Sequence, residues 1–214
     1  MKISASERSA LLSIITGFSR QHIIVLGDLV ADEFIYGEIA RVSREAPVLI
    51  LKQREKTIVP GGGANAANNL VDLGARVTPV SAVGTDETGG ALIRLFQEKD
   101  VSVRHVLRLG DYVTPTKSRV LGVLSHGHPQ QIVRVDREPR ARLSAAIRRR
   151  LRRAVESTLA KASALLISDY GYGVTDFSWC AGQKSRRTGR RFDHIFASRS
   201  LNAIHCGYLH AFPN

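Results

Sequence analysis

Runs of apolar residues alternate with segments whose apolar residues recur at helical spacing along most of this 214-residue chain. Apolar runs bounded by glycine and polar residues are typical of buried parallel strands, and recurrence every three to four residues is typical of helices with one buried face. The pattern predicts helices at residues 6–20, 63–74, 88–99 and 143–161, and strands at 22–28, 34–52, 76–83, 103–107, 117–124, 130–136 and 164–169. This alternation predicts an α/β fold with a mostly parallel sheet.

The composition fits one good-sized core and no membrane span. Hydrophobic residues make up 43% of the chain, which is enough to build a core in a protein of this length. There is no run of 18 apolar residues, and the N-terminal apolar residues follow helical spacing, unlike those of a signal peptide. The two cysteines lie far apart and give no disulfide framework. We therefore expect a cytoplasmic protein.

Arginines crowd residues 137–153 and 186–191 and contribute to the formal net charge of +12. Such a cluster is typical either of a surface that binds nucleic acid or an acidic membrane, or of a solvated helix. Leu143, Ile147 and Leu151 supply an apolar stripe for a helix whose other faces carry the arginines. Aromatic residues make up only 6% of the chain, and no helix-turn-helix or RNA-binding motif is present, which argues against a nucleic-acid partner.

A triglycine segment, Pro60-Gly61-Gly62-Gly63-Ala64-Asn65, leads into the helix predicted at 63–74. Three adjacent glycines let the backbone approach a ligand closely. Fixing their backbone costs conformational entropy, which is unfavourable unless a ligand or a neighbour requires it. The amide of Asn65 has both donors and acceptors, as the hydroxyls of a sugar require. Gly61, Gly62 and Asn65 are therefore candidate sugar-binding residues, although a glycine-rich loop before a helix is also a general anion site.

Acidic side chains follow the first predicted strand. Asp28 and Asp32 lie where an open α/β sheet binds its ligands, at the carboxyl ends of its strands. Both are candidate ligands of sugar hydroxyls, with the alternative that each only fixes a turn.

Cationic side chains alternate on two later strands. Lys117, Arg119 and Arg134 could hold a sugar phosphate, since ammonium and guanidinium groups both bind phosphate oxygens. The alternative is pairing with carboxylates across the strands. His126 and His128 have no neighbouring cysteine or carboxylate cluster, so we predict no metal site.

Taken in chain order, these motifs resemble those of the ribokinase-like (PfkB) carbohydrate kinases, and most closely the heptose-7-phosphate kinase module of ADP-heptose biosynthesis, a lipopolysaccharide precursor pathway. The resemblance covers residues 8–176. The motifs are His22-Ile23-Ile24-Val25-Leu26-Gly27-Asp28, the triglycine segment, Ala82-Val83-Gly84-Thr85-Asp86, Thr116-Lys117-Ser118-Arg119-Val120, Gln131-Ile132-Val133-Arg134-Val135-Asp136 and Leu166-Ile167-Ser168-Asp169-Tyr170-Gly171-Tyr172-Gly173.

The resemblance implies a ribokinase-like, doubly wound, mostly parallel sheet with a small β-sheet lid at about 34–59 and 112–136. It implies ATP-dependent phosphorylation of a sugar phosphate with Mg²⁺, and a homodimer formed through the lid. It also implies an acidic sugar contact at Asp136 and a position near the nucleotide phosphates for Asp169. Tyr172 stands where the family has a lysine.

The sequence also departs from the family. Its Gly-Ala-Gly-Asp turn, which supplies the anion hole and the catalytic base, does not occur in these 214 residues, so no catalytic residue is assigned. We therefore expect a fold incomplete at the C-terminus and an inactive or weak kinase. Residues 177–214 are expected to be a divergent tail, either frameshifted or an insertion. The alternatives are a non-catalytic sugar-binding fragment, a pseudogene product and, more remotely, a basic nucleic-acid binder.

Overall fold

The computed structural model describes residues 3–123 and 127–175, and the backbone of 194–199. In chain order the elements are α1 (Ala5–Gly17), the 3-10 helix η1 (Phe18–Arg20), β1 (His22–Gly27), β2 (Leu29–Val42), β3 (Leu49–Gly61), α2 (Gly62–Asp72), β4 (Arg76–Gly84), α3 (Glu87–Gln97), β5 (Val106–Leu109), β6 (Thr116–Val123), β7 (Gln130–Arg137), α4 (Ala145–Leu159), β8 (Ala164–Asp169) and β9 (His194–Arg199).

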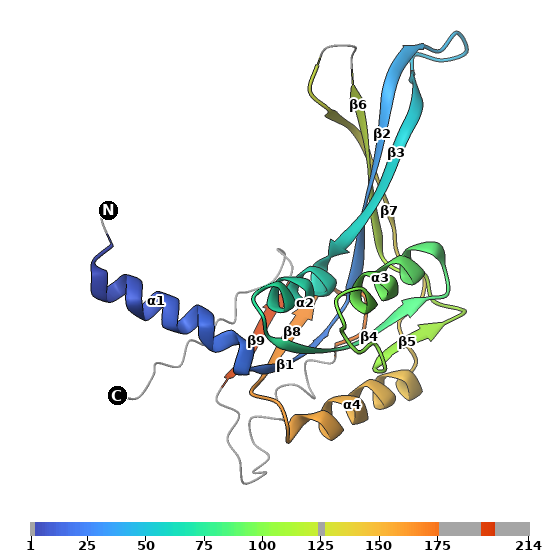
Figure 1. Ribbon diagram of the computed structural model, residues 1–214. Helices are drawn as coiled ribbons and strands as arrows, with labels where there is room; N and C mark the ends of the chain where they lie inside the picture. The colour runs from blue at the N-terminus through green and yellow to red at the C-terminus, as the bar shows by residue number, and fades with distance from the viewer. Residues whose placement is uncertain (1–2, 124–126, 176–193, 200–214) are drawn as a thin grey trace.

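Five parallel strands form the central sheet in the order β5-β4-β1-β8-β9. Every residue of β1 is buried, because strands on both sides and helices on both faces cover it. Helices α2 and α3 lie on one face of the sheet and α4 lies on the other (Figure 1). The predicted doubly wound α/β fold is confirmed.

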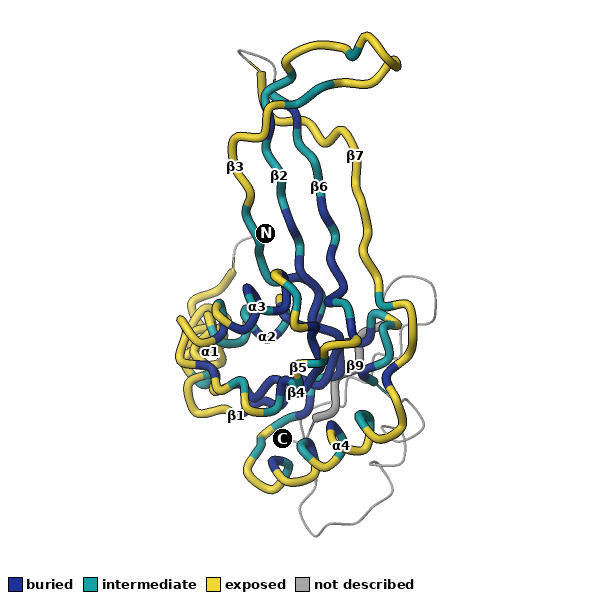
Figure 2. Tube along the Cα trace, turned by 90° about the vertical axis from the view of Figure 1, so that its right-hand side faces the viewer, coloured by how far each residue is buried: buried dark blue, intermediate teal, exposed yellow. Residues whose placement is uncertain are grey.

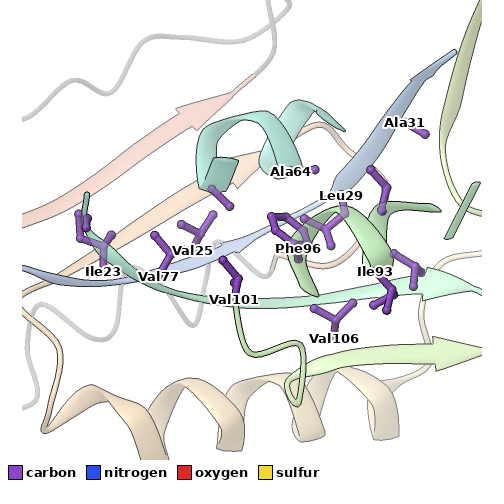
Figure 3. Packing of buried hydrophobic residues seen from close by; sticks show 14 residues of the cluster. Ile23, Val25, Leu29, Ala31, Ala64, Val77, Ile93, Phe96, Val101 and Val106 are labelled. Carbon is purple, nitrogen blue, oxygen red and sulfur yellow. The ribbon is translucent and has the colours of Figure 1, made fainter. Parts of the chain in front are cut away.

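Alternation along β1 divides the core between these two faces. Ile23 and Val25 pack with Val77 and Phe96 in the cluster under α2 and α3 (Figure 3). Ile24 belongs to a second cluster on the α4 side of the sheet. One strand therefore supplies side chains to both halves of the core.

Helix α4 is amphipathic, as the interpretation of the arginine cluster as a solvated helix predicts. Leu151 and Val155 are buried, whereas Arg149, Arg150 and Arg153 are exposed. The arginines therefore lie on the faces that do not contact the sheet.

A second sheet, the lid, extends from the carboxyl edge of the central sheet (Figure 2). Its strand order is β3-β2-β6-β7; β2 is parallel to β6, and the two outer pairs are antiparallel. Only Asp28 separates β1 from β2, so the chain passes directly from one sheet into the other. The lid strands expected within 34–52 are longer than predicted, since β2 begins at Leu29 and β3 continues to Gly61.

Helix α1 leads into the amino end of β1 and has no buried residue. None of the described helices has the length and apolar character needed to span a membrane. Strand β9 pairs in parallel with β8 and falls within the segment 177–214 that the sequence analysis treats as a divergent tail. The rest of that segment lies outside the described residues.

Candidate functional site

Two rows of polar and aromatic side chains cross one face of the lid. In the strand register, Asp32 of β2 is opposite Lys117 of β6, which is opposite Asp136 of β7. Two residues away along each strand, Phe34 is opposite Arg119, which is opposite Arg134. Since paired residues on neighbouring strands share a face, these six side chains form one surface. The lid therefore brings together five of the residues that the sequence analysis selected.

Asp32 is held at the base of this surface by a hydrogen bond from Arg119 and by close packing against Gly61. Its Oδ1 accepts a hydrogen bond from Arg119 Nη1 at 2.6 Å, and the Arg119 guanidinium lies 5.3 Å from the ring centre of Phe34. A Cβ atom on Gly61 would lie 2.5 Å from Asp32 Oδ2, so any larger residue would displace the carboxylate from this position. The Asp32 and Arg119 side chains remain 24% and 25% exposed, which leaves them accessible to a ligand.

The other cations of the surface differ in their partners. Arg134 Nε lies 2.8 Å from Asp136 Oδ1, and its Nη2 donates to Asp136 Oδ2 at 3.0 Å, a bidentate pair. Lys117 Nζ lies 5.7 Å from the ring centre of Tyr170, which follows β8. Among the described residues no carboxylate forms an ion pair with Lys117. The Lys117 ammonium is therefore the cation of this surface with the most freedom to bind an anion.

Asp28 does not belong to this surface. Its side chain is fully buried, and its Oδ2 accepts hydrogen bonds from the backbone N–H groups of Tyr170 and Tyr172 at 2.8 and 3.2 Å. Its Oδ1 accepts from the N–H of Val174 at 3.1 Å. Burial raises the pKa of Asp28, and the three N–H donors act in the opposite direction. These hydrogen bonds hold the segment 170–174 against the end of β1, as the alternative that Asp28 fixes a turn predicts.

The loop after β8 contains two other residues considered from the sequence. Asp169 is buried, and its Oδ1 accepts from the N–H of Gly171 at 2.9 Å, so it helps to shape the loop. Tyr172 donates a hydrogen bond to Glu138 at 3.1 Å. Burial and the Glu138 carboxylate raise the pKa of Tyr172 to about 12. A phenol is never a cation, so Tyr172 does not supply the positive charge that the family resemblance implies at this position.

The triglycine segment packs against the end of β1. Gly62 has φ +52°, and a Cβ on it would lie 2.7 Å from Val30, so this position requires glycine. The N–H of Gly63 donates to the carbonyl of Asp28 at 2.9 Å, and this N–H is therefore not free for a ligand. Asn65 is exposed in the first turns of α2. The N-cap of this helix is Gly61, which packs against Asp32.

On the opposite face of the lid is a network that sequence reasoning missed. Glu33 is buried. It accepts a hydrogen bond from Ser118 Oγ at 2.5 Å and forms an ion pair with Lys56 Nζ at 2.9 Å. Lys56 also bonds Glu87, the first residue of α3, at 3.0 Å. Burial opposes ionisation of Glu33, but the bonds from Ser118 and Lys56 outweigh it and lower its pKa. The network ties the base of the lid to α3.

Sequence reasoning also missed Tyr170 and Phe34. Phe34 could have been found, because it is two residues after Asp32 on one strand and so shares its face. Together the surface residues offer a carboxylate for hydroxyl donors, an aromatic wall and cations for an oxyanion. Among the described residues, no group of three or more His, Cys, Asp or Glu side chains could hold a metal ion.

Similar proteins agree with this architecture. The profile of the pfkB family of carbohydrate kinases matches residues 21–203. The Bifunctional protein HldE of Pelobacter propionicus is 38% identical over 168 residues, which are 78% of this chain and 33% of that protein. The protein of the same name from Magnetococcus marinus is 36% identical over 173 residues, 79% of this chain and 34% of its own length. This chain thus spans about a third of the length of these relatives.

Two solved structures share the fold. The phosphofructokinase-2 of Escherichia coli, in complex with fructose-6-phosphate, aligns with a TM-score of 0.57 and 20% identity over 85% of this chain and 55% of that one. The ribokinase of Cryptococcus neoformans, in complex with ADP, aligns with a TM-score of 0.50 and 18% identity over 84% of this chain and 49% of that one. The family match covers well over half of the sequence, and the chain belongs to the pfkB family of carbohydrate kinases.

Proposed function

We propose that this chain binds a phosphorylated heptose on the face of its lid that carries Asp32, Lys117 and Arg119, as the sugar-binding part of a kinase of the heptose 7-phosphate type. The observation that carries the proposal is the contact of Asp32 with both Arg119 and Gly61, beside a lysine without a carboxylate partner. The relatives named HldE support the choice of a heptose phosphate over other sugars.

The proposed roles follow from the chemistry of each group. Asp32 accepts hydrogen bonds from sugar hydroxyls, and the Arg119 ion pair fixes its orientation. Lys117 binds the phosphate already present on the sugar, as a compact charge that no carboxylate neutralises. The remaining hydroxyls are assigned to Asn65, exposed on α2, and to the Arg134–Asp136 pair on the same face of the lid as Asp32.

ATP is the phosphate donor that the family resemblance implies. In the part of the chain that the structure describes, no residue cluster fits a Mg²⁺ ion, so we assign none and derive no transfer step. The sequence has no Gly-Ala-Gly-Asp turn. Because that turn supplies the family's anion hole and base, we expect these 214 residues alone to bind the sugar phosphate and to transfer phosphate weakly or not at all.

We also propose that two lids associate. Strand β7 is the outer strand of the described lid sheet, and its residues are exposed along its length (Figure 2). Val133 and Val135 are 48% and 56% exposed on it. An unpaired edge with apolar side chains is suited to contact a second lid. Light scattering after gel filtration should give twice the mass of the chain, and a monomer at all concentrations would contradict this proposal.

Calorimetric titration of the chain with a heptose 7-phosphate tests the main proposal, and an ADP-release assay on the same sample tests transfer. We expect saturable binding that Asp32→Asn weakens by about tenfold or more, since it removes a charged acceptor. Arg149→Gln on α4 is the control and should bind like the parent. Absence of binding, or equal affinity in Asp32→Asn, would contradict the assignment of this surface.

A further inference from the structure

A hollow of about 540 Å³ lies at the amino edge of the central sheet, on the side away from the lid. Arg76 begins β4 and is the register partner of His22, which begins β1, and Lys161 precedes β8. The turns after α3 close the hollow with Lys99 and Arg104. Its volume is typical of a small-molecule site.

Cations outnumber carboxylates among the residues that line the hollow. Four cationic side chains line it, namely Arg76, Lys99, Arg104 and Lys161, against a single carboxylate, that of Asp100. They come from three separate segments, the start of β4, the turns after α3 and the turn before β8, so the fold and not a local charge run gathers them.

The charge is only partly neutralised within the protein. Asp72 pairs with Lys99. Arg76 and Lys161 have no ion-pair partner in the part of the chain that the structure describes. Like charges in a concave surface focus a positive potential, which an anion would relieve.

A rigid wall backs these cations. The His22 ring is buried, with Nδ1 2.9 Å from the carbonyl of Lys161 and Nε2 2.8 Å from Thr78 Oγ1. A carbonyl can only accept, so Nδ1 carries the hydrogen. Both bonds fix the backbone of Lys161 against β1 and β4, so that its side chain starts from a defined position.

We propose that this hollow binds a compact multivalent oxyanion of the pyrophosphate class, with Arg76 and Lys161 as its main ligands. The site is distinct from the sugar surface, because the two lie at opposite edges of a parallel sheet. It does not depend on the proposed kinase function. Bound anion would link the starts of β1, β4 and β8 and stabilise the fold.

Thermal unfolding of the full chain in sodium pyrophosphate tests the proposal, with sodium chloride at equal ionic strength as reference. We expect a saturable rise in Tm of roughly 5 °C in pyrophosphate only. The double variant Arg76→Gln/Lys161→Gln should lose the rise. Arg149→Gln/Arg150→Gln, which removes the same charge from exposed α4 positions, should keep it.

Two further variants make the outcome decisive. Lys161→Gln alone changes one exposed side chain, and it should reduce the rise even if the double variant folds poorly. Lys117→Gln should keep the rise, because it alters only the lid. The proposal is overturned by an equal rise in chloride, by an equal loss in the α4 control, or by loss of the rise in Lys117→Gln.

Discussion

Asp28→Asn should destabilise the chain although it changes a single oxygen atom to an NH₂ group. The Asp28 carboxylate is fully buried and accepts three backbone N–H groups, two on Oδ2 and one on Oδ1. An asparagine oxygen can keep the pair from Tyr170 and Tyr172, but its NH₂ group then faces the N–H of Val174. One buried donor loses its acceptor, which costs about 1–3 kcal/mol.

Urea unfolding followed by circular dichroism measures this cost. We expect the midpoint to fall with an unchanged slope, and Tm to fall by about 2–4 °C for each kcal/mol lost. Asp28→Ala removes all three acceptor contacts and should leave little folded protein, because domain stability is only about 5–15 kcal/mol.

Asp32→Asn is the matched control for Asp28→Asn. The Asp32 carboxylate is partly exposed, and its ion pair with Arg119 is accessible to water. Such pairs contribute about 0–1 kcal/mol, so this variant should bind the sugar more weakly but lose little stability. Equal unfolding free energies for Asp28→Asn and the parent, within about 0.5 kcal/mol, would refute the assignment of Asp28 as the support of the loop.

Gly61→Ala should weaken sugar-phosphate binding at least about tenfold, because its Cβ would lie 2.5 Å from the carboxylate of the site; Gly110→Ala, with open space around it, should bind normally, and equal binding by both would refute the steric argument. Lys56→Met should cost about 1–3 kcal/mol of unfolding free energy, because it leaves the buried carboxylate of Glu33 without its cation. Its control, Arg54→Met, removes an exposed pair and should cost less than about 1 kcal/mol. The folded-state pKa of Glu33 is lowered, so its stabilising effect is present above the unfolded pKa, about 4.5, and is lost as the pH falls below it. The stability difference between the parent and Glu33→Gln should therefore shrink between about pH 6 and about pH 3, and a difference independent of pH would contradict the assigned ionisation.

The order of helices and strands could be predicted because apolar residues recur along the chain with the spacing of a helix or form the continuous runs of a buried strand. Strand β8 has the predicted bounds, 164–169, since an apolar run there ends in Ser-Asp. The start of the lid could not be predicted in the same way. The residues from Leu29 to Ala31 are apolar and fully buried like those of β1, and nothing in their pattern marks the passage from one sheet to another.

The candidate site shows a similar division. Alternation places Lys117 and Arg119 on one face from sequence alone. The roles of Asp28 and Asp32 could not be separated, because both are carboxylates close to the end of one strand. Burial against a loop 142 residues away distinguishes the surroundings of Asp28 from those of Asp32, and that contact leaves no local signal. Tyr170 was missed for the same reason, since this loop positions its ring.

The affinity ratio between a heptose 7-phosphate and the same heptose without phosphate tests the central claim most directly, measured by calorimetry in the parent and in Lys117→Gln. If Lys117 binds the phosphate, the parent should prefer the phosphorylated sugar by about tenfold or more, as expected for a hydrogen bond to a charged group. The Lys117→Gln variant should lose this preference and keep its affinity for the unphosphorylated sugar. A preference that survives the substitution, or a parent that binds both sugars equally, would contradict the assignment of the lid surface as a sugar-phosphate site.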